Sequence, residues 1–310
     1  MTSAKKIRSG TKSIITILVF LLISVLMSRE ISTYMLDGLK LAWGVIIPTV
    51  FPFMIFSEAA YATLSFCENG MVGKIYEKIF AMPRATLAAF VCGILGGFPV
   101  GAKMSIEMKN NGIISKEECE RLMTFSNIPS IAYTVCAVGI GFWNDVYIGI
   151  LLYLITLISA VICGKLIGIK KSFSCNTVFI SKQSFNFIGV LKSAAASSVN
   201  IAFFIAFFAV ICGIIRKYIV FPQAALLLIS FFEVGNAVSV ISDLRIFSPC
   251  LSLAIIAFSL SFSGISVIMQ SLSMHGGEDI SFIRFFKLKL LQGGIAFVLS
   301  GCFFSFYIIK

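Results

Sequence analysis

Long apolar segments follow one another along this chain, and each approaches the length that a helix needs to cross a bilayer. About 20 residues suffice for one crossing, and the candidate segments are Ser13–Met27, Leu39–Ala62, Phe125–Gly141, Val146–Leu166, Ala194–Ile215, Leu251–Ser273 and Leu291–Ile308. Hydrophobic residues make up 58% of the 310 residues and charged residues only 13%, whereas soluble domains carry about 25% charged residues. We therefore predict an all-α integral membrane protein embedded in the lipid bilayer.

Two further apolar segments contain residues that disfavour a continuous helix. Thr86–Ala102 holds four glycines and a proline, and Ala224–Val240 holds Glu233, Gly235 and Asn236. Glycine and proline interrupt helical hydrogen bonding, and lipid offers no other partner for the freed backbone groups. Such backbone is tolerated where it packs inside the protein or lines a wet cavity. We predict that these segments are re-entrant hairpins or broken helices.

Basic residues between the segments predict how the chain crosses the membrane, because they concentrate on the cytoplasmic side. Four of them precede the first span, which places the N-terminus in the cytoplasm. The first span then exits, and a short turn leads back into Leu39–Ala62. If both irregular segments are hairpins, the later basic loops also face the cytoplasm, including Lys165–Lys192 and the last turn with Arg284, Lys287 and Lys289. If they were full spans, Lys165–Lys192 would lie outside.

This topology predicts an inverted repeat, in which each half has a span, a hairpin and two further spans. Weak similarity supports it: Pro83–Leu87 resembles Pro222–Leu226, and Phe125–Ile128 resembles Phe262–Ile265. The predicted parts are a basic segment with the first transmembrane helix (1–38), a first repeat (39–168), a basic cytoplasmic linker (169–185) and a second repeat (186–310).

The interrupted segments of the first half supply candidate binding residues. Free N–H groups at a helix start attract anions, and Lys103 adds a positive charge beside them. The predicted solute-binding residues of this half are Gly96, Gly97, Pro99, Gly101, Lys103, Ser126, Asn127, Pro129 and Ser130. In the alternative, the glycines serve packing at a hairpin tip, Lys103 reaches the membrane interface, and Pro129 opens an ordinary capped helix.

The second half contributes an acid. A carboxylate inside an apolar segment is costly and usually functional, so we predict that Glu233, and Glu58 in the first half, couple transport to a proton or sodium ion. The predicted solute-binding residues here are Gly235, Asn236, Ser263, Gly264, Ser266 and Gln270. In the alternative, Glu233 is a structural partner of a lysine or of backbone N–H groups, the small residues serve helix packing, and Glu58 lies near the end of its span.

Other classes of protein are not expected. The sequence has no HExxH, GxSxG or P-loop motif, so we expect no enzyme, no catalytic residue, no cofactor and no metal. The net charge of +11 reflects loop residues and not a basic stripe interleaved with aromatic residues, so nucleic-acid binding is not expected. The charged stretch Lys109–Arg121 predicts a solvated cytoplasmic helix. The oligomeric state stays open.

The motifs of the chain resemble those of a known family. The run GILGGFPVGAKMSIEMKNNGIISKEECERLMTFSNIPS (Gly93–Ser130) resembles the nucleoside-recognition, or gate, domain, and more narrowly the sporulation integral membrane proteins of the YlbJ type. The matching motifs are the G-x-P-x-G-A-K turn at Gly97–Lys103, the E-x-x-R-L helix at Glu118–Leu122, the asparagine segment at Phe125–Pro129, the acidic hairpin at Phe232–Gly235 and the G-x-S-V-x-x-Q segment within Ser263–Gln270.

The resemblance implies a fold similar to concentrative nucleoside transporters, in which a solute binds between two hairpins and two broken helices. It also implies a bacterial cell membrane or spore membrane and, for the sporulation relatives, dipicolinic acid as the solute. We therefore predict a secondary-type transporter of a small polar, anionic solute that is dipicolinate-like or nucleoside-like. The alternative is a non-transporting scaffold of a sporulation complex, which predicts satisfied polar groups in the breaks and no cavity.

Overall fold

The computed structural model describes residues 18, 21–22, 25–64, 70–169, 186–274 and 277–308. The predicted N-terminal basic segment, most of the first predicted span and all but the first residue of the predicted linker 169–185 lie outside these ranges. Within the described ranges every regular element is a helix, and no strand occurs. The all-helical prediction is confirmed for this part of the chain.

The helices are short in the middle of each half and long at its end. In chain order they are α2 (Ser28–Leu41), η1 (Ala42–Ile46), α3 (Ile47–Leu64), α4 (Met71–Phe80), η3 (Arg84–Thr86), α5 (Leu87–Gly96), α6 (Val100–Asn110), α7 (Lys116–Ser126), η4 (Tyr133–Phe142), α8 (Val146–Gly168), α9 (Phe187–Tyr218), α10 (Pro222–Phe232), α11 (Val234–Leu244), α12 (Pro249–Phe262), α13 (Gly264–Leu272) and α14 (Phe282–Ile308).

Five helical stretches in the described residues are long and apolar enough to cross a membrane, or six if one bent pair counts as a single span. The five are Ser28–Tyr61, Val146–Gly168, Phe187–Tyr218, Pro249–Leu272 and Phe282–Ser305. The bent pair joins Met71–Phe80 to Arg84–Gly96 at an angle of 98°. Each of the five overlaps a predicted span, so the chain is a multi-pass membrane protein, as predicted.

The turn predicted between Met27 and Leu39 is limited to Met27, the non-helical residue before α2, and it does not extend to Leu39. Instead, α2, η1 and α3 run on as one helical stretch of 34 residues from Ser28 to Tyr61. Close packing on α9 explains why the helix continues through this region. A Cβ added at Gly38 would lie only 2.6 Å from the Cβ atom of Ala209, so the glycine lets the two helices cross in direct contact.

Four interruptions divide the shorter helices. Residues 97–99 separate α5 from α6, and Gly97 has a φ of +73°. Glu233 alone separates α10 from α11 and is extended, with φ −148° and ψ 124°. Four non-helical residues follow α7, and Ser263, with a φ of +74°, ends α12. The interruptions lie at the glycine, proline, serine and asparagine residues that predicted them.

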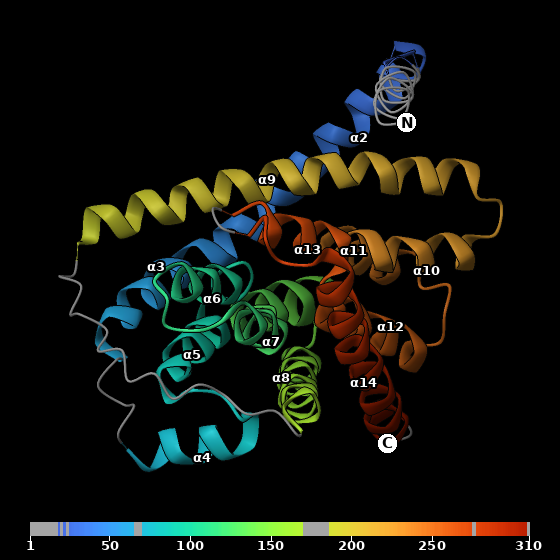
Figure 1. Cartoon of the computed structure of the whole chain (residues 1–310). Helices are drawn as coiled ribbons and strands as arrows, with labels where there is room; N and C mark the ends of the chain where they lie inside the picture. The colour runs from blue at the N-terminus through green and yellow to red at the C-terminus, as the bar shows by residue number, and fades with distance from the viewer. Residues whose placement is uncertain are drawn as a thin grey trace, which may run out of the picture.

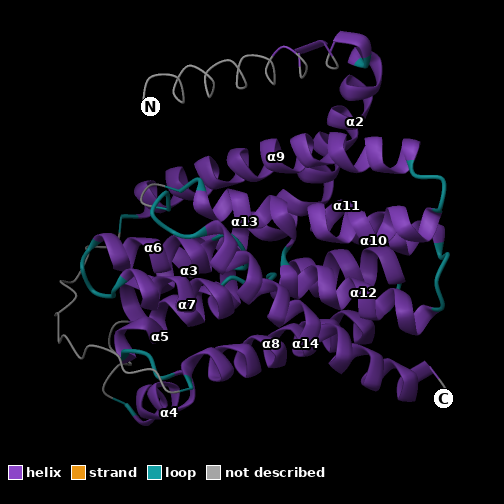
Figure 2. Cartoon of the chain, turned by 45° about the vertical axis from the view of Figure 1, so that its right-hand side comes forward, coloured by secondary structure: helices purple, strands orange, loops and turns teal. Residues whose placement is uncertain are grey.

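The interrupted helices lie between two outer groups of helices. On one side, α9 crosses the molecule over α3, α13, α11 and α10 (Figure 1), and it packs on α2, α3, α10 and α13. On the other side, α14 packs on α8 and α12 (Figure 2). The breaks are therefore inside the protein, which is where non-helical backbone at membrane depth is tolerated.

The charged stretch Lys109–Arg121 is not a solvated helix, so that prediction is wrong. α7 begins within it at a capping box, and its charged side chains at Glu118, Glu120 and Arg121 are buried. Arg121 donates hydrogen bonds of 2.7 and 3.0 Å to two carbonyl groups at the end of α4. Glu120 forms an ion pair of 2.9 Å with Arg284 of α14. Distant partners thus make burial of these charges tolerable.

The α5–α6 hairpin packs on the end of α7 through two glycines. A Cβ added at Gly101 would lie 2.2 Å from the Ser126 carbonyl oxygen, and one added at Gly93 would lie 2.1 Å from the same atom. We expect Gly101→Ala to destabilise the fold by roughly 1–3 kcal/mol or more, measured as a lower melting temperature in detergent. Gly294→Ala is the control, because no atom lies within 4 Å of its added Cβ. Equal melting temperatures would contradict the close contact.

Candidate functional site

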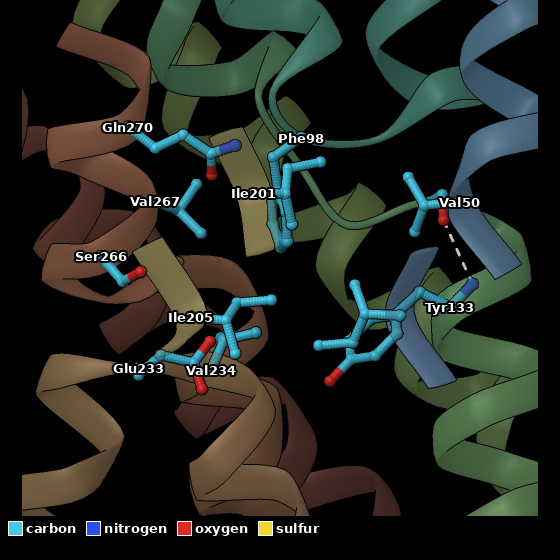
Figure 3. Close-up of a pocket in the computed structure, with 12 residues that line it drawn as sticks. Val50, Phe98, Tyr133, Ile201, Ile205, Glu233, Val234, Ser266, Val267 and Gln270 are labelled. Carbon is cyan, nitrogen blue, oxygen red and sulfur yellow. Dashed lines mark hydrogen bonds between the residues drawn. The ribbon is translucent and has the colours of Figure 1, made fainter. Parts of the chain in front are cut away.

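A small cavity lies where the interruptions meet. Its lining residues are Ile46, Val50, Phe98, Ser130, Tyr133, Ile201, Ile205, Glu233, Val234, Ser266, Val267 and Gln270. Its volume is about 30 Å³, and about 10–15 Å³ suffices for one water molecule. Figure 3 shows Phe98, Ile201 and Gln270 at one end, and Glu233 and Tyr133 at the other. The cavity is therefore large enough for about two waters, and polar groups lie along its length.

The interruptions place the polar residues of this lining. Ser130 is the last non-helical residue after α7, and its hydroxyl accepts a hydrogen bond of 3.1 Å from the Tyr133 backbone N–H. Glu233 stands alone between α10 and α11. Ser266 and Gln270 lie one turn apart on α13, and therefore on one face of it. The breaks thus bring together polar side chains that are far apart in the sequence.

The buried carboxylate of Glu233 caps the start of α11. It accepts hydrogen bonds of 2.9 Å from the Gly235 backbone N–H, 2.5 Å from the Asn236 backbone N–H and 2.7 Å from the Asn236 side-chain amide. Backbone N–H groups in the first turn of a helix have no partner within the helix. This geometry matches the structural alternative, in which Glu233 is a partner of backbone N–H groups. The capping carboxylate also lines the cavity.

Several buried polar atoms near the breaks have no hydrogen-bond partner in the described part of the chain. Two belong to cavity-lining residues that are each 3% exposed, namely the Tyr133 hydroxyl and the Gln270 side-chain nitrogen. Asn127 Oδ1 and the Ser263 hydroxyl lie in the breaks themselves. An unpaired buried polar group costs about 1–3 kcal/mol. We therefore expect water or a ligand to bind these atoms.

Each hairpin tip packs against one of the two broken helices. A Cβ added at Gly97 would lie 2.5 Å from the Ser130 backbone nitrogen. A Cβ added at Gly264, where φ is +70°, would lie 3.0 Å from the Phe232 carbonyl oxygen. Both positions have the positive φ and the lack of space that favour glycine. The two halves of the chain therefore share one kind of contact between hairpin tip and break.

Lys103 and Glu58, which were predicted to act separately, form an ion pair. The Lys103 Nζ atom lies 2.7 Å from Glu58 Oε1, and it also contacts the Ser193 hydroxyl of α9. Neither residue lines the small cavity. Lys103 instead lines a second, more open cavity of about 400 Å³ between α6 and α9. Its positive charge is compensated by Glu58 and is not directed at the Glu233 region.

Four of the predicted binding and coupling residues line the small cavity: Ser130, Glu233, Ser266 and Gln270. The others, apart from the Lys103–Glu58 pair, build the breaks and hairpin tips around it: Gly96, Gly97, Pro99, Gly101, Ser126, Asn127, Pro129, Gly235, Asn236, Ser263 and Gly264. Asn127 also connects the two broken helices, because its side-chain amide donates a hydrogen bond of 3.1 Å to the Ser271 hydroxyl of α13.

Two residues of this region, Tyr133 and Lys289, were not among the predicted site residues. Tyr133 supplies an unpaired hydroxyl, and the only signal in the sequence was a tyrosine inside an apolar segment. Lys289 was predicted in a cytoplasmic turn, which is wrong because α14 already begins at Phe282 and the lysine is fully buried. Its Nζ donates hydrogen bonds to the carbonyls of Asn127 (2.9 Å) and Thr124 (3.4 Å) at the end of α7. It therefore caps the broken helix from a different element.

The fold and the site define a multi-pass helical membrane protein whose broken helices surround a buried polar cavity. The chain is a distant homologue of the sporulation integral membrane protein YlbJ of Bacillus subtilis (strain 168), with 27% identity over an alignment that covers 84% of this chain and 74% of the relative. The narrower resemblance that the motifs predicted, to sporulation integral membrane proteins of the YlbJ type, is thereby confirmed. No protein-family profile matches the chain, and no solved structure matches it.

Proposed function

We propose that the chain is a secondary-type transporter of a small polar, anionic solute. The observation that carries the proposal is the cavity at the junction of four helix interruptions, with the Tyr133 hydroxyl and the Gln270 amide nitrogen buried there without partners. Secondary transporters use discontinuous helices to present backbone and side-chain groups to a solute inside the membrane. A site with a purely structural role would pair its buried polar groups internally.

The unpaired groups favour a solute with acceptor oxygens. A tyrosine hydroxyl and a glutamine amide nitrogen both donate hydrogen bonds, and Ser130 and Ser266 add hydroxyls to the same lining. The N-terminus of α13 beside the cavity also favours negative charge. A dipicolinate-like dicarboxylate suits these donors, and it is the solute that the resemblance to sporulation membrane proteins implies. A nucleoside-like solute would use the same donors and is the second choice.

Transport of such a solute requires a wider cavity than the one described. About 30 Å³ holds water, whereas sites for drug-sized ligands occupy about 300–1,000 Å³. The arrangement therefore corresponds to a closed state of the proposed transporter. Glu233 is placed to couple an ion to opening, because protonation or cation binding would weaken the charged cap that holds α11. The coupling ion in this proposal is a proton or sodium.

The proposal includes an inverted repeat with a cytoplasmic N-terminus in a bacterial cell membrane or spore membrane. The repeat is supported by the matching contacts of the two halves, Gly97 with Ser130 and Gly264 with Phe232. The orientation is supported by the basic residues that precede the first span and follow α8.

A non-transporting scaffold of a sporulation complex is the second candidate. The observation that favours it is the carboxylate of Glu233, which accepts three hydrogen bonds from the first turn of α11 and so already has a structural role as a helix cap. The cavity and the unpaired Tyr133 hydroxyl favour the transporter, because a scaffold needs neither.

Uptake into proteoliposomes tests the proposal. We expect purified protein to accumulate labelled dipicolinate, and to do so only with a proton or sodium gradient across the vesicle membrane. Labelled nucleosides in the same vesicles test the second solute class, and protein-free vesicles are the control. If correctly inserted protein takes up none of these solutes under either gradient, the scaffold becomes the better account.

A further inference from the structure

We propose that the open cavity between α6 and α9 is the aqueous vestibule through which solute reaches the closed cavity. This inference rests on the proposed transport function and deepens it by assigning an access route. The open cavity has a volume of about 400 Å³, which is within the range of small-molecule sites. Polar side chains from two helices line it, including Lys103 and Glu107 of α6 and Ser197 and Asn200 of α9.

The first argument is that α9 lines the two cavities in succession. Ile201 and Ile205 line the closed cavity, and Ser197 and Asn200, at the turn before them, line the open one. One face of a helix presents residues three and four positions apart. The two cavities therefore lie end to end along α9, with the polar residues in the open cavity and the isoleucines in the closed one.

The hairpin and α13 make the same transition. Phe98 at the hairpin tip lines the closed cavity, and Lys103 further along α6 lines the open cavity. Gln270 of α13 lines the closed cavity, and Met274, one turn beyond it, lines the open cavity. Three separate elements thus line both cavities. The two cavities are therefore neighbours along all three elements, as an access route requires.

The close-up view identifies the end of the closed cavity that faces the vestibule. On each of the three elements, Phe98, Ile201 and Gln270 are the closed-cavity residues nearest in sequence to those that line the open cavity. Figure 3 shows all three at the same end. Two of these side chains are apolar, and the third has an unpaired amide nitrogen. We assign these three residues as the constriction between vestibule and cavity, with Gln270 as its hydrogen-bond donor.

The chemistry of the vestibule suits polar solutes in general. Lys103 is neutralised by its ion pair with Glu58, and Glu107 adds a negative charge to the lining, so the vestibule does not select for anions. The hydroxyl of Ser197 and the amide of Asn200 offer both donors and acceptors. Selection for acceptor-rich solutes then occurs at Gln270 and Tyr133, deeper in the path. In the proposed orientation the vestibule opens to the cytoplasm, because its α9 residues lie toward the helix start that follows the basic linker.

Thiol labelling tests the route without requiring transport. In a Ser266→Cys variant the new thiol lies in the closed cavity, whose volume of about 30 Å³ is too small for the reagent. A small, membrane-impermeant methanethiosulfonate reagent therefore reacts with it only when the constriction opens, and only from the side on which the vestibule lies. Intact mass relative to the parent chain counts the added label and excludes the native cysteines. We expect labelling in inside-out vesicles and not in right-side-out vesicles. Adding Asn200→Trp should obstruct the vestibule and slow labelling at least tenfold.

Val199→Trp is the matched control for the obstruction. Val199 is the neighbour of Asn200 on α9, is 44% exposed and does not line the vestibule, so tryptophan there should leave the labelling rate unchanged. No labelling from either side, equal slowing by both tryptophans, or labelling from the outer side alone would overturn the proposed route. If labelling follows the expectation while the parent protein takes up no solute, the access route stands and the transport function fails.

Discussion

Glu233→Gln is expected to abolish gradient-driven solute uptake while leaving the protein inserted in the membrane. The amide cannot take up a proton in the relevant pH range, and it lacks the charge that binds a cation. One of its two positions is also a donor, which would face an N–H group where the carboxylate now accepts hydrogen bonds from Gly235 and Asn236. We expect the initial uptake rate to fall at least about tenfold, equivalent to about 1.4 kcal/mol in the barrier.

Two further variants distinguish a role of Glu233 in coupling the ion to transport from a role as the cap of α11. Glu233→Asp keeps a carboxylate at a position where aspartate is among the best helix caps, so it should retain part of the gradient-driven uptake. Asp243→Asn removes a carboxylate from the exposed end of the same helix and should leave uptake unchanged. Undiminished uptake by Glu233→Gln would rule out the coupling role and leave the residue as a helix cap.

The places where helices break were predictable because the chemistry of a break is local. Gly97 and Gly264 have positive φ values, which glycine adopts freely, and Glu233 is a polar residue that caps the helix beginning next to it. Each signal lies within a few residues of the break it causes. The same holds for the long apolar spans, since length and composition alone decide whether a helix can cross a bilayer.

Partners of the charged residues were not predictable, because they lie on other helices. Lys103 meets Glu58, which lies 45 positions away in the sequence, and Arg121 meets the end of α4, 41 positions away. A local pattern assigns such residues to loops or solvated faces, which is the usual environment of charge. Only the packing of the helices reveals these partners, and that Glu58 and Arg121 are buried.

The cavity itself was only partly predictable, for the same reason. Ser130, Glu233, Ser266 and Gln270 were chosen because they lie in or near breaks, and all four line it. Tyr133 and most of the apolar lining, such as Val50, Ile201 and Ile205, come from continuous helix, where the sequence has no feature that separates a cavity wall from ordinary core. Predicting them would require knowing which face of η4 and α9 turns inward.

Lys289→Met is expected to destabilise the protein more than a change at any other lysine in the part of the chain that the structure describes, because Lys289 is the one that is fully buried there. The Lys289 ammonium donates hydrogen bonds to the carbonyls of Asn127 (2.9 Å) and Thr124 (3.4 Å) and to Gln292 Oε1 (3.0 Å). Methionine has a shape similar to that of lysine, and replacing Lys289 with it has two opposing effects on stability. Removing a buried cation avoids its desolvation cost, but the partner carbonyls remain buried and lose their donor.

The second effect should dominate, because the carbonyls belong to the backbone at the end of α7 and cannot be removed. Each unpaired buried acceptor costs about 1–3 kcal/mol, and the negative end of the α7 dipole loses a nearby cation. We expect a loss of about 2–5 kcal/mol and a melting temperature in detergent lower by roughly 5–10 °C. Lys287→Met is the control, because Lys287 is on the same helix and exposed, and its change should be small. A Lys289→Met protein as stable as the control would mean that water, and not Lys289, satisfies the end of α7.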